Sequence, residues 1–444
     1  MCWSELPDVL LEEVYSKLTY KQRYYCSMVC RHWYDLFYSS KVWEHFVLGE
    51  RTLTRRRMRP YRNSYMYTLS QYKAKMCLDR VGEFFKKITI KPISDYYNLY
   101  AFMTVLSAFL EFYEEYPMPL LHGFHFNFGC ENRGFSGITV HGTGGKILEE
   151  LKRLLGNMKN LEELTLNQLL LDKKEAPGLL ESVLENCAET LKVLEIVNCT
   201  KGSYPMFYAG MFMSLQKLII SPQHLSSDVI AMLASTSLTD IHIVQDRHTD
   251  GVAPINSQTW FEVKQMSPRL QVRLEARGGT REEILFQPRA PVTSIVYDSP
   301  YLKMTPDAVM MITDHYRKTL RLYAQKGLPR THGSRSFHER CDGLVLMLVR
   351  QCPELRVLII RERISSMTLL LVASQAKKLQ KLYVRQNAVL KKTDWPKTLE
   401  WSDEYYADLK KKSQSYELLQ KEISRCMGYP WKLLTDKEFE KLKI

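Results

Sequence analysis

Residues 161–167 read Leu-Glu-Glu-Leu-Thr-Leu-Asn, and this stretch decides the fold. Its last residues alternate between apolar and polar, which is typical of a short strand with one buried face. The same L-x-x-L-x-L spacing returns at intervals of 22 to 40 residues. Copies begin at Leu161, Leu191, Leu215, Leu238, Leu355 and Leu379, and looser copies begin at Phe85, Leu121 and Val292. A period of this length predicts an array of stacked units.

Helical patterns lie between these strand signatures. They cover residues 176–190, 225–236, 305–319 and 365–378. One strand with one helix cannot bury its own apolar face, but stacked units form a continuous core. The pattern resembles leucine-rich repeats, with degenerate strands near 270–274 and 320–322. Separate α/β domains are the alternative, which is disfavoured because no Gly-rich loop begins any unit.

The resemblance to leucine-rich repeats also implies a role for the residue that follows each strand. In such repeats an Asn or Cys at this place bonds the backbone of the turn. The residues concerned are Asn127, Asn167, Asn198 and Cys199.

The first 50 residues have a different pattern. Pro7 suits the first turn of a helix, with Ser4 as its cap, and apolar residues then recur at helical spacing. One apolar face contains Leu10, Leu11, Val14 and Leu18, and a second contains Tyr24, Met28, Val29, Trp33 and Phe37. Three short helices bury little surface alone, so these faces must contact something else. From periodicity alone, a cap on the following repeats and a docking module are both open.

This segment resembles an F-box over residues 3–47. The motifs that carry the resemblance are Leu6-Pro7-Asp8, Leu18, Ser27-Met28-Val29-Cys30-Arg31-His32-Trp33 and Trp43. The resemblance implies docking on the Skp adaptor of a cullin-RING ubiquitin ligase. The adaptor-binding residues that it implies are Leu6, Pro7, Leu10, Leu11, Val14, Leu18, Val29, Cys30 and Trp33. The sequence departs from the family pattern at Gln22, where Asp is common, and at the bulky Tyr24 and Tyr25.

An F-box followed by such repeats resembles the F-box/leucine-rich-repeat substrate receptors of SCF ubiquitin ligases. The implied fold class is α/β: a three-helix F-box, then a curved solenoid with parallel strands on its concave face and helices outside, then a helical tail. The expected boundaries are 1–50 for the F-box, 51–84 for a basic linker and connecting helix, 85–400 for the repeats and 401–444 for the tail.

The implied function is that of a non-catalytic receptor. It would hold a protein target close to a charged ubiquitin-conjugating enzyme and so raise the effective concentration of that target. The alternative is a repeat scaffold or RNA-associated protein whose F-box serves only assembly.

Outward side chains of the strands are the candidate substrate contacts, because successive residues of a strand alternate between two faces. Those singled out are His125, Asn127, Thr165, Asn167, His242, Arg361, Tyr383 and Arg385. Ile359 falls on the same face. The last repeats add Arg363, Lys391 and Lys392, so a basic C-terminal groove would suit an acidic or phosphorylated target.

No motif in the sequence predicts catalysis or a cofactor. His141–Lys146 contains three glycines before a lysine, but the sequence lacks the first glycine of a nucleotide-binding loop and its final Ser or Thr. We therefore expect a flexible loop between repeats there. His122 with His125, and His242 with His248, lack Cys or carboxylate residues at supporting spacing, so no metal site is expected.

The net charge of +13 is concentrated in one stretch. Residues 51–91 carry twelve basic and two acidic residues, or +10, whereas residues 1–50 carry −2 and the remainder carries +5. Arg51–Arg62 permits three interpretations: a solvated linker face, a nuclear-localisation run, or a strip that contacts RNA or phosphate with stacking tyrosines. Its place between the F-box and the repeats favours the linker, so nucleic acid is not expected as a partner.

The cysteines and the N-terminus predict a cytoplasmic or nuclear protein. The ten cysteines are dispersed with no CxxC pair, and the first residues lack a basic and apolar leader. No apolar run approaches the roughly 20 residues of a membrane span.

The tail is predicted to be helical. Residues 404–423 read as one helix, residues 428–431 break it, and residues 436–442 form a short last helix. Two interpretations are open, of which the first is preferred: a cap over the final repeat, or a lid or strand that enters the concave face.

Overall fold

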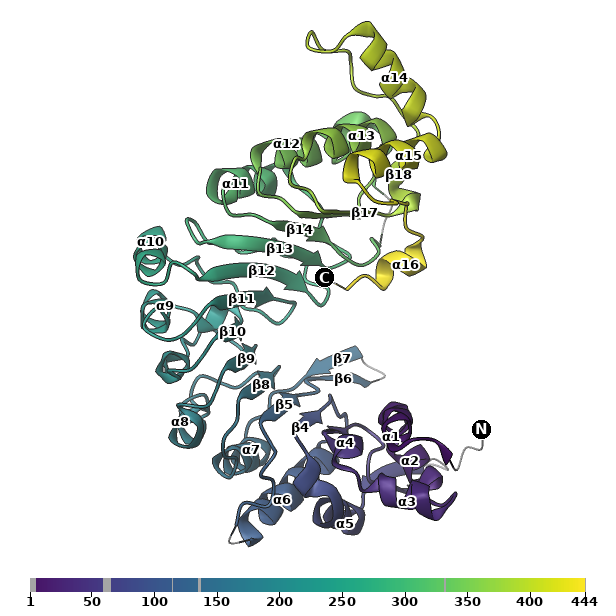
Figure 1. Cartoon of the computed structure of the whole chain (residues 1–444). Helices are drawn as coiled ribbons and strands as arrows, with labels where there is room; N and C mark the ends of the chain where they lie inside the picture. Colours follow the sequence, from purple (N-terminus) through teal and green to yellow (C-terminus); the bar gives the residue numbers. More distant parts are fainter. Residues whose placement is uncertain (1–4, 59–64, 114, 135–136, 331–332, 444) are drawn as a thin grey trace. The chain divides into compact units, whose positions relative to one another are not determined.

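Figure 1 shows the computed structural model of the chain. It describes residues 5–58, 65–113, 115–134, 137–330 and 333–443. The chain divides into two compact units, Met1–Leu238 and Thr239–Ile444. No helix in these described ranges is long and apolar enough to cross a membrane.

The first unit begins with short helices, purple in Figure 1. They are α1 (Asp8–Lys17), α2 (Tyr20–Ser27), α3 (Arg31–Phe37) and α4 (Ser40–Trp43). Leu11, Tyr15 and Trp33 are buried between them, and the Tyr15 hydroxyl donates to the Trp33 carbonyl at 2.9 Å. Pro7 directly precedes α1, and the predicted cap Ser4 lies outside the described residues. The predicted helical box is confirmed.

The departure from the family pattern at Gln22 has a structural role. α2 begins at a capping box, in which the Thr19 hydroxyl accepts from the Gln22 N–H and the Gln22 side chain accepts from the Thr19 N–H at 2.9 Å. The next residue, Arg23, is buried with its guanidinium over the rings of Tyr20 and Trp43. The start of α2 is therefore fixed by local contacts and by packing.

Six parallel strands lie side by side in chain order within the described part of the first unit. They are β1 (His45–Leu48), β4 (Lys87–Ile90), β5 (Gly123–Asn127), β8 (Glu163–Asn167), β9 (Val193–Val197) and β10 (Lys217–Ile220). Leu164, Leu194 and Leu218 stand opposite one another in the register and are fully buried. The repeated signature thus stacks leucines on one face of the sheet, as its spacing predicts.

β1 has no counterpart among the predicted strands. It pairs in parallel with β4, with Phe46 opposite Ile88, and the Phe46 ring stacks on Phe85 with ring centres 4.9 Å apart. The sheet therefore begins within the first 50 residues, and backbone hydrogen bonds join the helical box to the repeats.

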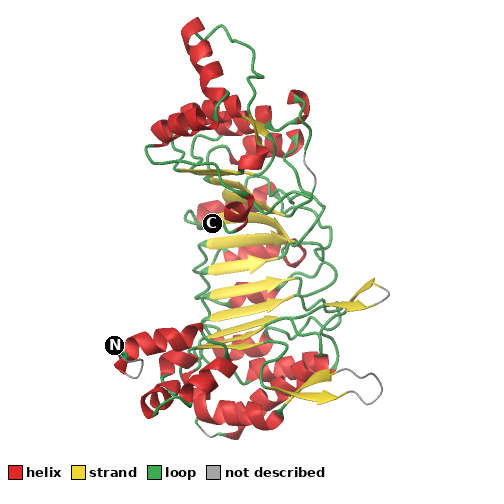
Figure 2. Cartoon of the chain, turned by 90° about the vertical axis from the view of Figure 1, so that its right-hand side faces the viewer, coloured by secondary structure: helices red, strands yellow, loops and turns green. Residues whose placement is uncertain are grey.

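The helices of the first unit cover one face of its strands (Figure 1). They are α5 (Gln71–Val81), α6 (Tyr96–Phe112), α7 (Lys146–Gly156), α8 (Glu181–Cys187) and α9 (Ser227–Leu233). α8 and α9 lie within the predicted ranges 176–190 and 225–236. Figure 2 shows two antiparallel ribbons that stand beside the sheet. These are β2 (Thr54–Met58) with β3 (Tyr65–Leu69), and β6 (Glu131–Gly134) with β7 (Gly137–Val140).

The glycine-rich segment 141–146 leads into α7. The Thr143 N–H donates to the Leu169 carbonyl at 2.7 Å, which anchors this loop on the next repeat. A Cβ atom on Gly142 would lie 2.4 Å from the Leu170 carbonyl oxygen. Gly142 therefore permits a close approach of two backbones.

His224 is fully buried in the first unit. Its Nε2 accepts from the Cys199 N–H at 3.0 Å, and its Nδ1 donates to the Tyr204 carbonyl at 3.1 Å. This arrangement requires a neutral ring. Burial lowers the pKa of His224 to about 4.

We expect the free energy of unfolding to fall as the pH is lowered from 7 to 5. His224 has a pKa of 6.5 when unfolded and about 4 when folded, so between these values the unfolded state binds more protons. The stabilisation is present above pH 6.5 and is lost as the pH falls towards 4, with a loss of about 2 kcal/mol at pH 5. Urea unfolding at pH 7, 6 and 5 measures it. His224→Gln should flatten the dependence and the exposed His338→Gln should not; the same slope in both would contradict this account.

The second unit repeats the strand and helix order. Its strands, again parallel and in chain order, are β11 (Asp240–Gln245), β12 (Gln271–Arg277), β13 (Val292–Asp298), β14 (Leu322–Gln325), β15 (Val357–Ile360) and β17 (Lys381–Val384). Its helices before the tail are α10 (Ser257–Met266), α11 (Pro306–Tyr316), α12 (Asp342–Gln351) and α13 (Ser366–Gln375). Thr305 and Ser365 cap α11 and α13 through their hydroxyl oxygens. The predicted helices at 305–319 and 365–378 are confirmed, as is the order of helical box, strand–helix array and helical tail.

The tail contains one more helix than predicted among its described residues. Its helices are α14 (Asp403–Ser413), α15 (Tyr416–Met427) and α16 (Asp436–Glu440). The prediction of one helix over residues 404–423 was wrong, because Ser415 caps a new helix by accepting from the Glu417 N–H. The predicted break is present, since Gly428 ends α15 with a left-handed φ of 74°.

Different parts of the tail match the two interpretations made from the sequence. α15 packs against α13, the last helix of the array. The segment 431–443, which includes α16, lies against the strands: Leu434 forms a parallel bridge with Arg385, and Phe439 packs on Ile359. The tail therefore caps the last repeat and also covers the outward face of its strands.

Phe439→Ala is expected to release the segment 431–443 from the strands. The Phe439 side chain is buried against Ala324 and Ile359, and removing it costs about 3 kcal/mol of packing. α16 is five residues long, so it should detach while the rest of the unit stays folded. Hydrogen–deuterium exchange of residues 433–443 should rise in this variant and stay unchanged in Phe112→Ala, whose side chain is exposed. Unchanged protection in Phe439→Ala would contradict the prediction.

Candidate functional site

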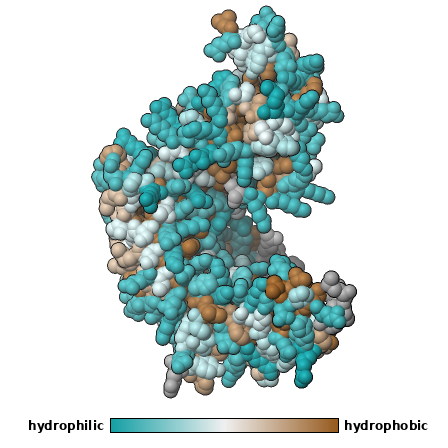
Figure 3. All heavy atoms as spheres, viewed as in Figure 1, coloured by the Kyte–Doolittle hydropathy of each residue, from teal (hydrophilic) through white to brown (hydrophobic). Residues whose placement is uncertain are grey.

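The helical box has an exposed apolar face. Pro7 is exposed, and Val9, Leu10, Met28 and Val29 have exposed fractions of 63%, 53%, 59% and 65%. Figure 3 shows hydrophobic side chains gathered over this part of the first unit. We call these five residues the apolar face. A cluster of exposed apolar side chains of this kind marks a site of protein association.

The predicted adaptor-binding residues fall into three groups. Pro7, Leu10 and Val29 are exposed; Leu6, Val14, Leu18 and Cys30 are half-buried; Leu11 and Trp33 are buried. Buried Leu11 and Trp33 can support the apolar face but cannot contact another protein directly. The contact between His32 Nε2 and the Leu6 carbonyl, at 3.3 Å, ties the start of α1 to α3. Sequence reasoning missed Val9 and did not assign Met28 to the docking set, although both adjoin residues that it named.

Outward side chains of β5, β8 and β9 form a ladder of polar contacts. His125 Nδ1 and Thr165 Oγ1 are 2.8 Å apart, and the Asn167 amide donates to Asn127 Oδ1 at 2.9 Å and to Glu195 Oε1 at 2.8 Å. The predicted role of Asn127 and Asn167 in bonding the turn is corrected here, because their amides bond across strands. Burial lowers the pKa of His125.

The remaining predicted face residues lie in the second unit. His242 Nε2 is 2.8 Å from Glu275 Oε2, and Tyr383 packs in the cluster around Phe439. Thus His242 lies on the strand face with a carboxylate partner. Tyr383 is partly covered by the tail.

Arg361 and Arg385 do not line an open groove, which corrects the prediction of a basic C-terminal face. Arg361 is 1% exposed, and its guanidinium donates to the carbonyls of Ser299, at 2.8 Å, and Lys326, at 2.7 Å. Arg385 is 4% exposed and pairs with Asp436 of α16 at 2.6 Å. Both follow the last residue of a strand, so the alternation of faces does not extend to them.

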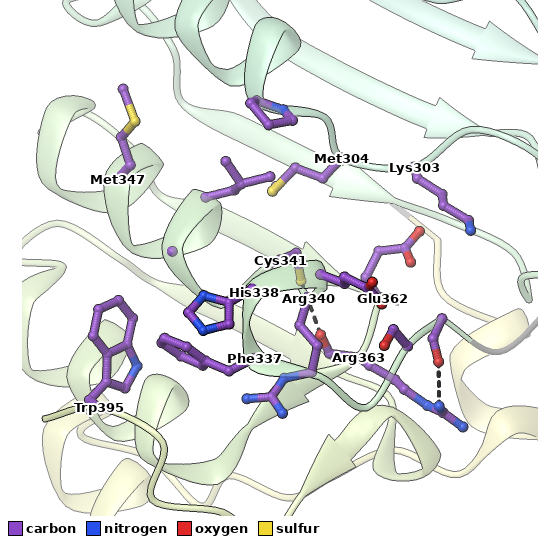
Figure 4. Close-up of a pocket in the computed structure, with 16 residues that line it drawn as sticks. Lys303, Met304, Phe337, His338, Arg340, Cys341, Met347, Glu362, Arg363 and Trp395 are labelled. Atoms are coloured by element: carbon purple, nitrogen blue, oxygen red, sulfur yellow. Dashed lines mark hydrogen bonds between the residues drawn. The ribbon is translucent and has the colours of Figure 1, made fainter.

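The second unit contains a pocket of about 700 Å³ (Figure 4). Its lining comes from loops, short helical turns and α12, in four segments: 303–306, 333–347, 362–363 and Trp395. Figure 4 shows Phe337, Trp395 and Met347 towards one end and the charged Lys303 and Glu362 towards the other. We call this the loop pocket. Sequence reasoning missed it because its residues are far apart in the chain.

Buried polar contacts hold the walls of the loop pocket. The Trp395 Nε1–H donates to Thr368 Oγ1 at 2.7 Å. Arg340 donates to Asp342 at 2.7 Å and also pairs with Asp394. Burial raises the pKa of Glu362 at the charged end. A pocket with fixed walls of this kind loses little conformational entropy when a ligand binds.

Among the described residues, no group of three or more His, Cys, Asp or Glu side chains is placed to hold a metal ion. The buried Cys199 instead donates its thiol hydrogen to the Leu166 carbonyl at 3.2 Å. Burial raises the pKa of Cys199.

The apolar face and the array define a helical docking module joined to leucine-rich-repeat-like units. A family model of the F-box domain matches residues 3–45, which include the apolar face. The chain therefore contains an F-box domain, which is followed by leucine-rich-repeat-like units. No curated protein matches the chain.

Two solved structures are similar to the chain at low identity. One is an internalin from Listeria monocytogenes, with 10% identity, a TM-score of 0.27 and coverage of 74% of this chain and 85% of that chain. The other is a TLR13–ssRNA13 complex, with 13% identity, a TM-score of 0.31 and coverage of 69% of this chain and 47% of that chain. The assignment of repeats rests on the strand order, the register and the helix caps of this chain.

Proposed function

We propose that this protein is the substrate-recognition subunit of an SCF ubiquitin ligase. The observation that carries the proposal is the exposed apolar face within the F-box match. In this role the protein docks on a Skp adaptor through that face and presents a target on the repeats. Its contribution is proximity, because holding the target near a charged ubiquitin-conjugating enzyme raises the effective concentration. The protein works in the cytoplasm or the nucleus.

Co-purification from cells tests this function. The full chain should bring down a Skp adaptor together with a cullin, and its bound proteins should accumulate when the proteasome is inhibited. An adaptor without a cullin would instead favour the second candidate, a repeat scaffold whose F-box serves only assembly. Absence of the adaptor would contradict both.

The loop pocket is a suitable binding site for part of the target. An apolar or aromatic side chain of the target enters beside Phe337 and Trp395, and a polar group next to it reaches Lys303 or Glu362. This combination of an aromatic-lined hollow with a few charged groups is typical of ligand pockets.

Met347→Asp is expected to weaken target capture at least about tenfold, because a charge at the apolar end raises the cost of burying an apolar group there. Met347 is 36% exposed, so the change should not disturb folding. Met310→Asp is the matched control, since Met310 is an exposed helix residue of the same unit that does not line the pocket. Quantitative proximity labelling with the proteasome inhibited compares the two. Equal capture by both variants would place the target elsewhere.

A further inference from the structure

The β2–β3 ribbon has one edge whose backbone groups are taken and one that is free at Arg56. The Tyr67 carbonyl accepts from the Asn98 amide at 2.8 Å, and the Leu69 N–H donates to Asn98 Oδ1 at 2.7 Å. Asn98 is a buried residue of α6, so β3 is tied to the first unit along this edge. The Tyr67 carbonyl thus points away from β2. Arg56 stands opposite Tyr67 in the antiparallel register, and in such a pair the backbone groups of both residues point outward. The N–H and the carbonyl of Arg56 therefore point away from β3.

The free edge belongs to β2, and Arg56 lies at its centre. Neither the N–H nor the carbonyl of Arg56 has a hydrogen-bond partner among the described residues. Thr54, two residues earlier, uses its carbonyl to accept from Lys73 Nζ at 3.0 Å. An exposed edge with free donors and acceptors is a template for another strand.

The same edge is strongly cationic. Arg55, Arg56 and Arg57 are exposed, and no ion pair joins them to a carboxylate in the part of the chain that the structure describes. Their side chains alternate between the two faces of the ribbon, so an added strand meets a guanidinium on either face. A second copy of β2 would place arginines against arginines, which disfavours self-association.

We infer that the β2 edge binds an extended acidic segment of a partner protein as a third strand of the ribbon. The segment has Asp or Glu at three or more alternating positions and no proline. Its backbone bonds the N–H and the carbonyl of Arg56, and its carboxylates lie on one face of the ribbon, where they pair with Arg55 and Arg57. This inference is independent of the proposed ligase function.

Nucleic acid fits the β2 edge less well than an acidic strand. A phosphate chain offers acceptors to arginine, but it lacks the alternating N–H and C=O groups with which a peptide strand pairs with both the N–H and the carbonyl of Arg56. The rings of Tyr65 and Tyr67 on β3 are also engaged, because the Arg56 guanidinium lies 3.3 Å from the ring centre of Tyr65 and the Arg51 guanidinium lies 4.8 Å from that of Tyr67. The combination of free backbone groups and charge therefore favours a peptide.

A binding experiment with the full chain tests the strand. The probe is a fluorescein-labelled peptide of four Glu-Val repeats, read by fluorescence anisotropy at low salt. Three competitors are used: the Gln-Val peptide, a Glu-Val peptide N-methylated at alternate residues, and a 15-nucleotide single-stranded RNA. We expect the Gln-Val and N-methylated peptides to bind at least about tenfold more weakly than Glu-Val.

One double variant tests the charge, and one pair of single variants tests the backbone pairing. The double variant Arg55→Glu, Arg57→Glu should bind the Glu-Val peptide at least about tenfold more weakly than the unchanged chain. Arg56→Pro removes the N–H at the free edge, where proline is tolerated, and Arg56→Ala removes the same charge but keeps the N–H. Arg56→Pro should bind about fivefold more weakly than Arg56→Ala. Thermal melting and adaptor binding check that each variant is folded.

Any of three results overturns the inference. The first is that the Glu-Val peptide does not bind, and the second is that the RNA binds more tightly than the Glu-Val peptide. The third is that Arg56→Pro and Arg56→Ala bind the Glu-Val peptide equally and the N-methylated peptide binds as tightly as the unmodified one. Adaptor binding uses the apolar face, so its loss or retention reports on the proposed function and not on this edge.

Discussion

Val29→Asp in the full chain is expected to weaken binding to a Skp adaptor by at least about a hundredfold. Val29 is 65% exposed and lies within the segment that matches the F-box domain. A carboxylate there would be buried without a partner on docking, and losses of 2–4 kcal/mol are typical at the centre of an interface. Leu10→Asp should have a similar effect from α1. Isothermal titration calorimetry with purified adaptor measures both.

The control for Val29→Asp is Phe112→Asp. Phe112 is 81% exposed but lies at the end of α6, outside the F-box, so this variant should bind the adaptor normally. Because Val29 and Leu10 are exposed in the free protein, their replacement should leave the melting temperature nearly unchanged. Normal adaptor binding by Val29→Asp and Leu10→Asp would show that the apolar face is not the docking surface.

Arg361→Ala is expected to destabilise the second unit by about 3 kcal/mol. The Arg361 guanidinium bonds the carbonyls of Ser299, Leu302 and Lys326, which belong to the loops after β13 and β14. Its removal leaves these buried acceptors without a donor and opens a cavity. Burial lowers the pKa of Arg361, which indicates that its surroundings already oppose the charge.

Urea unfolding of the full chain, followed by hydrogen exchange in the second unit, measures the effect of Arg361→Ala. Arg356→Ala is the matched control, because Arg356 is an exposed arginine just before β15, and its loss should change stability by less than about 0.5 kcal/mol. A similar small change in Arg361→Ala would mean that the three carbonyls find other donors.

The strand–helix array could be predicted from the sequence because the residues that repeat in the signature are the same residues that are buried in the fold. Leu164, Leu194 and Leu218 are in register and fully buried, so their spacing carries the fold directly. β1 was missed because four residues without a repeat signature form a strand only by pairing with β4. β2 was hidden by its composition, since three arginines in a row suggest a solvated segment, whereas strand formation depends on the partner strand more than on propensity.

The candidate sites were predictable to different degrees. The apolar face lies in one continuous segment that carries a motif, although exposure divides the predicted adaptor-binding residues into contacting and supporting ones. Arg361 and Arg385 were assigned to the outward face by alternation, which fails after β15 ends at Ile360 and β17 ends at Val384. The loop pocket was out of reach because no local pattern links Lys303, Glu362 and Trp395.

The pairing of β1 with β4 has a consequence for how the first unit folds. A fragment that starts at residue 51 would lack β1, which is an edge strand of the sheet. It would also lose the stacking of the Phe46 ring on Phe85. The F-box and the first repeats should therefore unfold in a single cooperative transition. Any stress that loosens the first repeats would then also weaken the hold of the box on an adaptor, even though the two surfaces are separate.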